Sequence, residues 1–539
     1  MEARGFVLDD EALRTDKRVE FHGKSQVDPG RDLQVVYPDT FSSMPPMVLN
    51  DSHDQRLHRH HRPVGGELCL FGPTQRRWSA NLDGTVALDE AEDLIKALGN
   101  ASHVVDDDVP EPVTVSYDYI TEAAIIVPPA LSSPMPPNGS LVTVGQFRLR
   151  WQSHPQPTIP SSYPGRGMVE STVINGVRTM ADGPFSLRFA SAEMHSGALF
   201  LVPEPPPFVR NMHELILWLD GLGIRKEKRS SWMAFVFTEQ AGTVNGERRV
   251  WLITHRSSKG ELQLIRTFPI RNDEFQARIP GLEGLAHKNV AVVGCGSMGS
   301  KIAVALAATG VANFGLIDYD IMEPSNSVRH EVGTDQFGSL KVAALADRII
   351  NVNPFAHERW KGMLLPIGRM NTLEAKLMLH ELLSSADLIV DTTGVHGVSH
   401  YINDICDHLG IPSLYASVTD GAWGGEIVQV IPGETACWNC WVNQYHDDAP
   451  PAEPKAEGIF FAPGCDQPTF TGTTYDIGMV ANMATSVAVE TLLRDEPDRK
   501  HIQGDYIQCQ THEANGMPHY TSAIREIRRR DDCPICNPT

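Results

Sequence analysis

Residues 289–341 read NVAVVGCGSMGSKIAVALAATGVANFGLIDYDIMEPSNSVRHEVGTDQFGSLK, and this stretch decides the fold of the C-terminal half. It opens with an apolar run at 289–293, which is typical of a buried parallel strand. Three glycines follow in G-x-G-x-x-G spacing, at Gly294, Gly296 and Gly299. Residues 300–309 have helical composition, and a second apolar run at 314–317 ends at Asp318. This order of strand, glycine loop, helix, strand and acid predicts a nucleotide-binding α/β unit.

The glycines and the acid have separate tasks in such a unit. The glycines let backbone N–H groups approach a phosphate at the N-terminus of the helix, where the helix dipole favours negative charge. Asp318, at the end of the second strand, can accept hydrogen bonds from a ribose. The alternative is a tight turn that only packs a helix against a strand and binds no ligand.

The polar residues that follow the acid indicate which nucleotide chemistry to expect. Asp320, Asn326, Arg329 and Lys341 lie within one short span. A hydride-transfer site does not need two cations here. A site in which a nucleophile attacks the α-phosphate of ATP does, because negative charge builds on the phosphates in the transition state.

The pattern D-x-D-x-x-x-x-S-N-x-x-R-H…G-x-x-K resembles the adenylyltransferase domain of ThiF-type and ubiquitin-activating enzymes, including their thiamin- and molybdopterin-pathway relatives. The resemblance runs from about residue 285 to the C-terminus. It implies a Rossmann-like adenylation domain that uses ATP. It also implies that Asp318 holds the ribose and that Asn326, Arg329 and Lys341 contact the ATP phosphates. These enzymes dimerise, so we expect a homodimer.

The acid that helps to hold Mg²⁺ departs from the family pattern. The apolar run 386–390 leads to Asp391-Thr392-Thr393-Gly394, where the resembling enzymes carry D-x-x-D. Gly394 stands in place of the second acid. Either Asp391 helps to bind Mg²⁺, or another acid such as Asp420 does. ATP–Mg²⁺ needs only one or two protein carboxylates, because phosphates and waters complete the shell.

Four of the nine cysteines form two C-x-x-C pairs, Cys437/Cys440 and Cys533/Cys536. Four thiolates suit a closed, tetrahedral structural zinc site. The gap between the pairs requires the C-terminus to fold back onto the Cys437 loop. The alternatives are two unconnected turns with free thiols or a redox pair. Neither pair opens a helix of a thioredoxin-like unit, which argues against the redox pair.

Cys465 lies in APGCDQP, ahead of a long amphipathic helix expected at about 476–494. A thiol between Gly and Pro would be exposed, and a nearby helix N-terminus favours its thiolate. The single-domain activating enzymes for the autophagy and ubiquitin-fold modifiers look similar here. That resemblance implies that Cys465 accepts the activated modifier as a thioester; the alternative is an inert loop thiol. We interpret Cys295, Cys406 and Cys509 as small buried hydrophobes.

Residues 33–98 show a different order of motifs: Tyr37-Pro38, Pro45-Pro46, a His/Arg cluster at 57–62, G-x-x-C-L at 66–70, Trp78, and a helical pattern at 88–98. This order resembles the core of ubiquitin-conjugating enzymes and places Cys69 where they form a thioester. Their H-P-N motif is absent. His60 and His61 stand there instead, and His61 could donate to an oxyanion or tune the Cys69 thiolate. Alternatively, Cys69 is an inert thiol in a docking domain.

Composition sets the remaining limits. The 539 residues carry 46 basic and 67 acidic side chains, a net charge of −21, which argues against binding to nucleic acid or anionic membranes. The chain lacks a signal-peptide pattern and any run of 18 apolar residues, so we expect a cytosolic protein without a transmembrane helix. The predicted domains are 1–105 (conjugating-enzyme-like), 106–280 (an α+β linker domain with core Trp232 and Trp251) and 281–539 (adenylation).

The sequence therefore predicts an enzyme that adenylates the C-terminus of a small ubiquitin-like protein with ATP and captures it on Cys465. Relay to Cys69 and ligation to a target would follow, as in the fused activating and conjugating enzymes of bacterial anti-phage defence that the chain resembles. Two alternatives stay open. The N-terminal domain could be a docking module that recruits a separate conjugating enzyme or a target. The chain could also adenylate a sulfur carrier and modify no protein.

Overall fold

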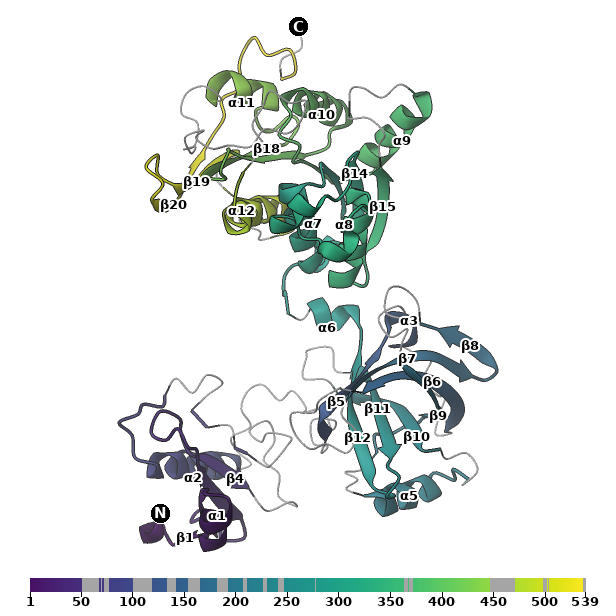
Figure 1. Cartoon of the computed structure of the whole chain (residues 1–539), viewed down its shortest axis with the longest axis vertical. Helices are drawn as coiled ribbons and strands as arrows, with labels where there is room; N and C mark the ends of the chain where they lie inside the picture. The colour runs from purple at the N-terminus through teal and green to yellow at the C-terminus, as the bar shows by residue number, and fades with distance from the viewer. Residues whose placement is uncertain are drawn as a thin grey trace. The chain divides into compact units, whose positions relative to one another are not determined.

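The computed structural model describes residues 1–50, 67–68, 70–71, 77–99, 119–132, 142–153, 165–181, 192–206, 211–225, 230–240, 247–276, 278–362, 367, 372–445, 471–497, 502 and 504–536. The chain divides into two compact units, Met1–Ile270 and Arg271–Thr539 (Figure 1). Among the helices in these ranges, none has both the length and the apolar composition needed to cross a bilayer.

The first unit begins with a four-stranded antiparallel sheet in the order β1-β2-β3-β4. Its strands are β1 (Val7–Leu8), β2 (Val19–Lys24), β3 (Asp32–Tyr37) and β4 (Met47–Asn50), and the accompanying helices are η1 (Glu2–Arg4), α1 (Asp10–Thr15) and α2 (Thr85–Gly99). Alternate residues of β3, Leu33 and Val35, are buried, as a half-buried strand requires. They pack with Leu88 and Ile95 of α2 in one core.

A second sheet of the first unit closes on itself. Its order is β5-β12-β11-β10-β9-β6-β7-β8, and an additional pairing of β5 with β7 completes a barrel. The strands are β5 (Tyr119–Val127), β6 (Thr143–Ser153), β7 (Gly165–Ile174), β8 (Val177–Met180), β9 (Glu193–Leu201), β10 (Trp232–Gln240), β11 (Glu247–Arg256) and β12 (Leu262–Pro269). Trp232 and Trp251 are buried, as predicted. Besides the short α3 (Pro129–Ser132), one helix, α5 (Met212–Gly221), packs its Leu215 and Leu219 against this sheet.

The second unit contains an eight-stranded sheet in the order β15-β14-β13-β16-β17-β18-β19-β20. The first five of these strands are parallel and the last three are antiparallel. They are β13 (Asn289–Val293), β14 (Asn313–Asp318), β15 (His357–Gly362), β16 (Leu388–Asp391), β17 (Ser413–Val418), β18 (Gly424–Val430), β19 (Tyr506–His512) and β20 (Pro518–Arg525). Short helices α6 (Asn272–Gln276) and η4 (Glu283–His287) precede the sheet.

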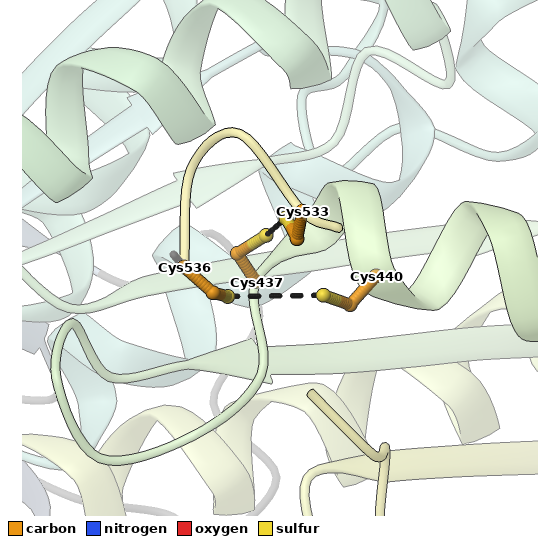
Figure 2. A group of neighbouring side chains, drawn as sticks. All are labelled: Cys437, Cys440, Cys533 and Cys536. Atoms are coloured by element: carbon orange, nitrogen blue, oxygen red, sulfur yellow. Dashed lines mark hydrogen bonds between the residues drawn. The ribbon is translucent and has the colours of Figure 1, made fainter. Parts of the chain in front are cut away.

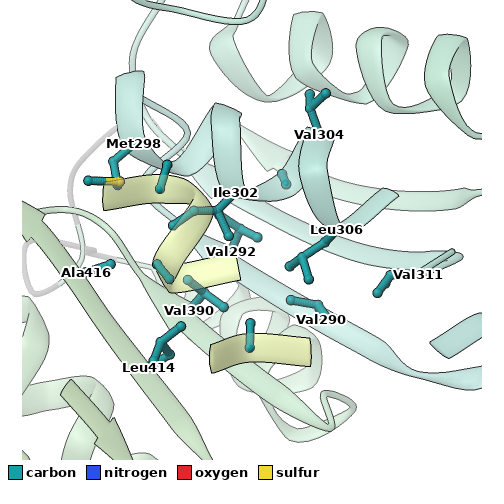
Figure 3. Packing of buried hydrophobic residues seen from close by; sticks show 14 of the residues in the cluster. Val290, Val292, Met298, Ile302, Val304, Leu306, Val311, Val390, Leu414 and Ala416 are labelled. Carbon is teal, nitrogen blue, oxygen red and sulfur yellow. The ribbon is translucent and has the colours of Figure 1, made fainter. Parts of the chain in front are cut away.

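Helices cover both faces of this sheet (Figure 1). On one face lie α7 (Ser297–Ala308), α8 (Lys341–Val352) and α12 (Thr474–Leu492). On the other lie α9 (Leu373–Ser384), α10 (His396–Leu409) and α11 (Trp438–Tyr445). Figure 3 shows the first face, where Ile302 and Leu306 of α7 meet Val290, Val292 and Val390 of the strands. All five side chains are almost fully buried, each worth about 1.5–3 kcal/mol of transfer free energy.

Candidate active site

The glycine loop joins β13 to α7, and its three glycines differ in what surrounds them. Gly294 has φ +88°, a left-handed conformation that favours glycine. A Cβ at Gly299 would lie 1.9 Å from the carbonyl oxygen of Gly294, so only glycine allows α7 to pack so closely on the strand end. A Cβ at Gly296 would meet no atom within 4 Å. Gly296 also caps α7 without any side-chain hydrogen bond, which leaves first-turn N–H groups for an anion.

Asp318 fixes the loop from the neighbouring strand. One carboxylate oxygen accepts the Cys295 N–H at 2.6 Å, and the other accepts the Asp320 N–H at 2.9 Å. Each carboxylate oxygen has a second lone pair, so Asp318 keeps acceptor capacity for ribose hydroxyls. The ribose contact predicted for Asp318 therefore fits this geometry.

Lys341 lies at the start of α8, where Asp320 holds it. The Nζ of Lys341 forms an ion pair with the Asp320 carboxylate, and the Lys341 N–H donates to the Asp320 carbonyl at 3.0 Å. The Lys341 side chain is only 13% exposed, whereas that of Asp320 is 44% exposed. A poorly hydrated ammonium beside the glycine-loop strand is suited to binding a phosphate oxygen.

The segment that carries Asn326 and Arg329 forms a 3-10 helix, η5 (Pro324–Val328). The Asn326 side chain accepts the Glu323 N–H at 3.1 Å, which fixes the start of η5. Arg329 follows directly after η5, and burial lowers the pKa of its half-buried guanidinium. An arginine stays protonated at neutral pH even so.

His330 joins this segment to the glycine loop, and the sequence analysis did not assign it a role. Its Nε2 lies 2.8 Å from the Cys295 carbonyl, and its Nδ1 accepts the Val332 N–H at 3.1 Å. Nε2 must therefore carry the proton and donate to Cys295. Burial lowers the pKa of His330, which keeps the ring neutral. In the sequence, only its position directly after Arg329 could have indicated that His330 belongs to the site.

Lys301 of α7 connects the segment that carries Arg329 to the start of α12. Its Nζ donates to the Glu331 carboxylate at 2.8 Å and lies 2.9 Å from the Thr474 hydroxyl at the start of α12. The glycine loop, the Arg329 segment and α12 are thus tied together at the carboxyl edge of the parallel strands, where ligands of open α/β sheets bind.

Asp391, one of two acids considered for magnesium, is 2% exposed. Its carboxylate accepts hydrogen bonds from the Ser399 hydroxyl at 2.6 Å and from the Thr393 hydroxyl at 2.7 Å and N–H at 2.9 Å. Burial raises its pKa. In this position Asp391 orders the turn into α10. Asp420, the other acid considered, is partly exposed just past the end of the adjacent strand β17.

The two C-x-x-C pairs lie together, as the sequence predicted (Figure 2). The Cys437 and Cys533 sulfur atoms are 3.5 Å apart, and those of Cys440 and Cys536 are 3.7 Å apart. Zn–S bonds of about 2.3 Å place the sulfurs of a tetrahedral site about 3.8 Å apart. The Arg530 N–H and the Asn439 amide point at the Cys440 and Cys533 sulfurs, each at 3.5 Å, as donors around metal thiolates do. The cluster could therefore hold a zinc ion.

Comparison with known families decides what this C-terminal unit is. Residues 273–535 match the family described as ThiF. The C-terminal unit is a ThiF family domain. The match agrees with the resemblance that the motif of residues 318–341 indicated.

One of the relatives described here matches most of the chain, and two others, whose names state an activity, match about half of it or less. An uncharacterized protein of Sinorhizobium fredii, y4qC, is 26% identical over 510 residues, which cover 85% of this chain and 82% of y4qC. The ATP-dependent ubiquitin transferase-like protein Cap2 of Pseudomonas aeruginosa is 25% identical over 53% of this chain and 50% of Cap2. Ubiquitin-like modifier-activating enzyme 5 of Oryza sativa subsp. japonica is 25% identical over 40% of this chain and 50% of that enzyme. The chain thus spans about half the length of the two relatives whose names state an activity.

Several predicted site residues lie outside the described residues. These are Cys465 of the ThiF domain, and Cys69, His60 and His61 of the N-terminal unit. The three cysteines interpreted as hydrophobes, Cys295, Cys406 and Cys509, are buried as predicted.

Proposed function

We propose that the ThiF domain adenylates the C-terminal carboxyl group of a small ubiquitin-like protein with ATP–Mg²⁺. The observation that carries this proposal is the open Gly296 cap of α7, with the cations of Lys341 and Arg329 on the segments bound to that loop. The names of two relatives, the ATP-dependent ubiquitin transferase-like protein Cap2 and ubiquitin-like modifier-activating enzyme 5, support ATP as the nucleotide and a ubiquitin-like protein as the substrate.

In this reaction the carboxylate attacks the α-phosphorus of ATP and pyrophosphate leaves. Negative charge grows on the phosphate oxygens, and Lys341 and Arg329 stabilise it. Asn326 fixes the start of η5 and so the position of Arg329, Asp318 holds the ribose, and the glycine loop cradles the phosphates. A bound Mg²⁺ would neutralise phosphate charge, with Asp420 favoured over Asp391 as its protein ligand.

The adenylate is then captured as a thioester. Cys465 attacks the acyl carbon, and AMP leaves with the bonding electron pair. Cys69 would receive the acyl group by thioester exchange, within a conjugating-enzyme-like domain of residues 1–105. A fusion raises the effective concentration of the two thiols. We also propose a homodimer, a linker domain at 106–280, and a structural zinc ion on the four clustered cysteines.

ATP–pyrophosphate exchange tests the adenylation step directly. Purified full-length chain is mixed with ATP, Mg²⁺, labelled pyrophosphate and, one at a time, small β-grasp proteins encoded beside its gene. Label should enter ATP only with a β-grasp protein that has an intact C-terminus, and the same protein with its last two residues removed serves as the control. Absence of exchange with every such protein would overturn the proposal. Exchange accompanied by a thiocarboxylate product and no reducible adduct would support a sulfur-carrier reaction instead.

A further inference from the structure

The C-terminal unit contains a cavity of about 550 Å³ that the candidate active site does not use. Its walls come from the end of β18, the last turn of α12 and the residues just before β19. β18 runs antiparallel to the parallel strands, and its Val430 pairs with Ser413 at the start of β17. The cavity therefore lies at the edge of the sheet opposite the glycine loop. Sites for small molecules typically measure about 300–1,000 Å³, so this cavity is large enough for one.

Acidic side chains outnumber basic ones on the wall of this cavity. Five acids and two arginines line it. Both arginines already have acceptors within the fold. Arg494 pairs with Glu434 at 3.4 Å and with Asp495 at 3.7 Å, and the Nε of Arg529 donates to the Thr435 carbonyl at 3.0 Å. The sign of the charge on the wall therefore favours a cation over an anion as the ligand.

Asp505 is the buried acid of this wall, with only 8% of its surface exposed. Its Oδ1 accepts the Ile527 N–H at 2.6 Å, which fixes the carboxylate in place. Burial raises the pKa of Asp505, and the negative charge of Glu526 raises it further. Among the described residues, no lysine or arginine forms an ion pair with Asp505. Buried carboxylates are normally paired, so a ligand cation would supply the partner that the fold does not.

The rest of the wall is suited to an aliphatic chain. Ile527 and Ala436 are 6% and 1% exposed and present apolar surface. The Thr491 hydroxyl donates to the Val487 carbonyl at 2.7 Å and accepts from the Gln429 amide at 2.6 Å, so these polar groups are already satisfied. A methylene stem can cover such a surface without leaving a polar group unpaired.

We infer that this cavity binds a small aliphatic polyamine, with an ammonium group at Asp505 and a methylene stem along Ile527. A linear amine fits because the acids come from separate elements: Glu434 follows β18, Asp495 follows α12, and Asp505 precedes β19. A metal ion fits less well. Among the described residues, the acids of this wall do not bring three ligand atoms within 4.8 Å of one another. The inference is independent of the proposed function, because the glycine loop lies at the other edge of the sheet.

Isothermal titration calorimetry of the full-length chain with spermidine tests this site, at an ionic strength of about 0.15 M so that weak surface attraction is screened. We expect saturable binding of a single spermidine per chain. Asp505→Asn should weaken binding by roughly 10–100-fold, because it removes the charge that accepts the ammonium hydrogen bond. Glu526→Gln changes an exposed acid without risk to the fold and should weaken binding less. The matched control, Glu374→Gln on the exposed side of α9, should bind spermidine as the unaltered chain does.

Two further ligands define the chemistry of the site. Mg²⁺ should bind more weakly than spermidine, and a tri-lysine peptide should do so too, because its backbone amides would meet the apolar wall. Tighter binding of the peptide would assign the cavity to a protein side chain and overturn the inference. Equal affinity for Mg²⁺, or equal losses in Asp505→Asn and Glu374→Gln, would also overturn it, since the net charge of −21 would then explain the binding. Pyrophosphate exchange without spermidine reports on the proposed function separately.

Discussion

At the scale of single residues, the glycine loop offers a matched pair of substitutions. Gly299→Ala places a Cβ 1.9 Å from the Gly294 carbonyl oxygen, whereas Gly296→Ala places one in open space. We expect Gly299→Ala to lower the free energy of unfolding by about 1–3 kcal/mol or more. Gly296→Ala should lower it by at most about 1 kcal/mol but weaken ATP binding, because the new methyl group would occupy the space that we propose for a phosphate. Urea unfolding and ATP titration of both variants would measure the two effects. Equal losses of stability would contradict the geometry.

Lys341 gives a second prediction at this scale. Lys341→Ala removes the ammonium that Asp320 holds at the start of α8. Losing one cation that stabilises transition-state charge should slow pyrophosphate exchange by roughly 10²–10³-fold. Lys376→Ala, on the exposed side of α9, is the control and should exchange at the normal rate. If Lys341→Ala exchanged as fast as Lys376→Ala, Lys341 would have no part in the chemistry.

His330 predicts a pH dependence of stability. Burial lowers its pKa in the folded chain, so below the usual histidine value of about 6.5 the unfolded state binds more protons. The stability contributed by neutral His330 is therefore present above about pH 6.5 and is lost as the pH falls towards the lower, folded value. The unfolding free energy of the C-terminal unit should decline by at most about 1.4 kcal/mol per pH unit from this site. His330→Gln should reduce that slope, and an unchanged slope would rule out His330 as its source.

At the scale of elements, local patterns predicted most of the ThiF domain. The strand 289–293 and its glycine loop were expected where they occur, because apolar runs and glycine spacing are properties of neighbouring residues. The helix begins at Ser297, not at Ser300, because its first turn lies inside the glycine loop. Closure of the middle barrel by β5 and β7 was not predictable, since strands of similar pattern do not indicate which of them pair. An α+β domain was expected there, and one helix longer than a single turn accompanies the barrel among the described residues.

The cluster of four cysteines also belongs to this scale, since it joins α11 to the C-terminal segment. Cys536→Ser should remove one of four ligands, so metal analysis should show less than one zinc ion per chain and the unfolding free energy should fall by several kcal/mol. Cys406→Ala removes a buried thiol that lies outside the cluster and should retain one zinc ion. A metal-free but equally stable parent chain would contradict a structural zinc site.

At the scale of the whole molecule, the residues of the candidate site differ in whether the sequence alone could indicate them. Asp318, Arg329 and Lys341 could be predicted together because one motif contains them all. The contact of His330 with the Cys295 carbonyl could not be predicted, because the fold brings together two segments that 35 positions separate. The contacts of Asp391 could not be predicted from the motif either, since its carboxylate is buried and accepts hydrogen bonds from Ser399 and Thr393. Position in a pattern does not report which way a carboxylate faces.

The most direct measurement of the central claim is non-reducing electrophoresis of the full-length chain after incubation with ATP, Mg²⁺ and the β-grasp protein that supports pyrophosphate exchange. We predict an adduct on Cys465 that forms only with ATP and disappears on adding a reductant. Cys465→Ser should give an oxygen ester that survives the reductant, and Cys69→Ala should retain the Cys465 adduct without onward transfer. An ATP-dependent adduct that persists unchanged in Cys465→Ala, or the absence of any adduct despite rapid exchange, would contradict the account.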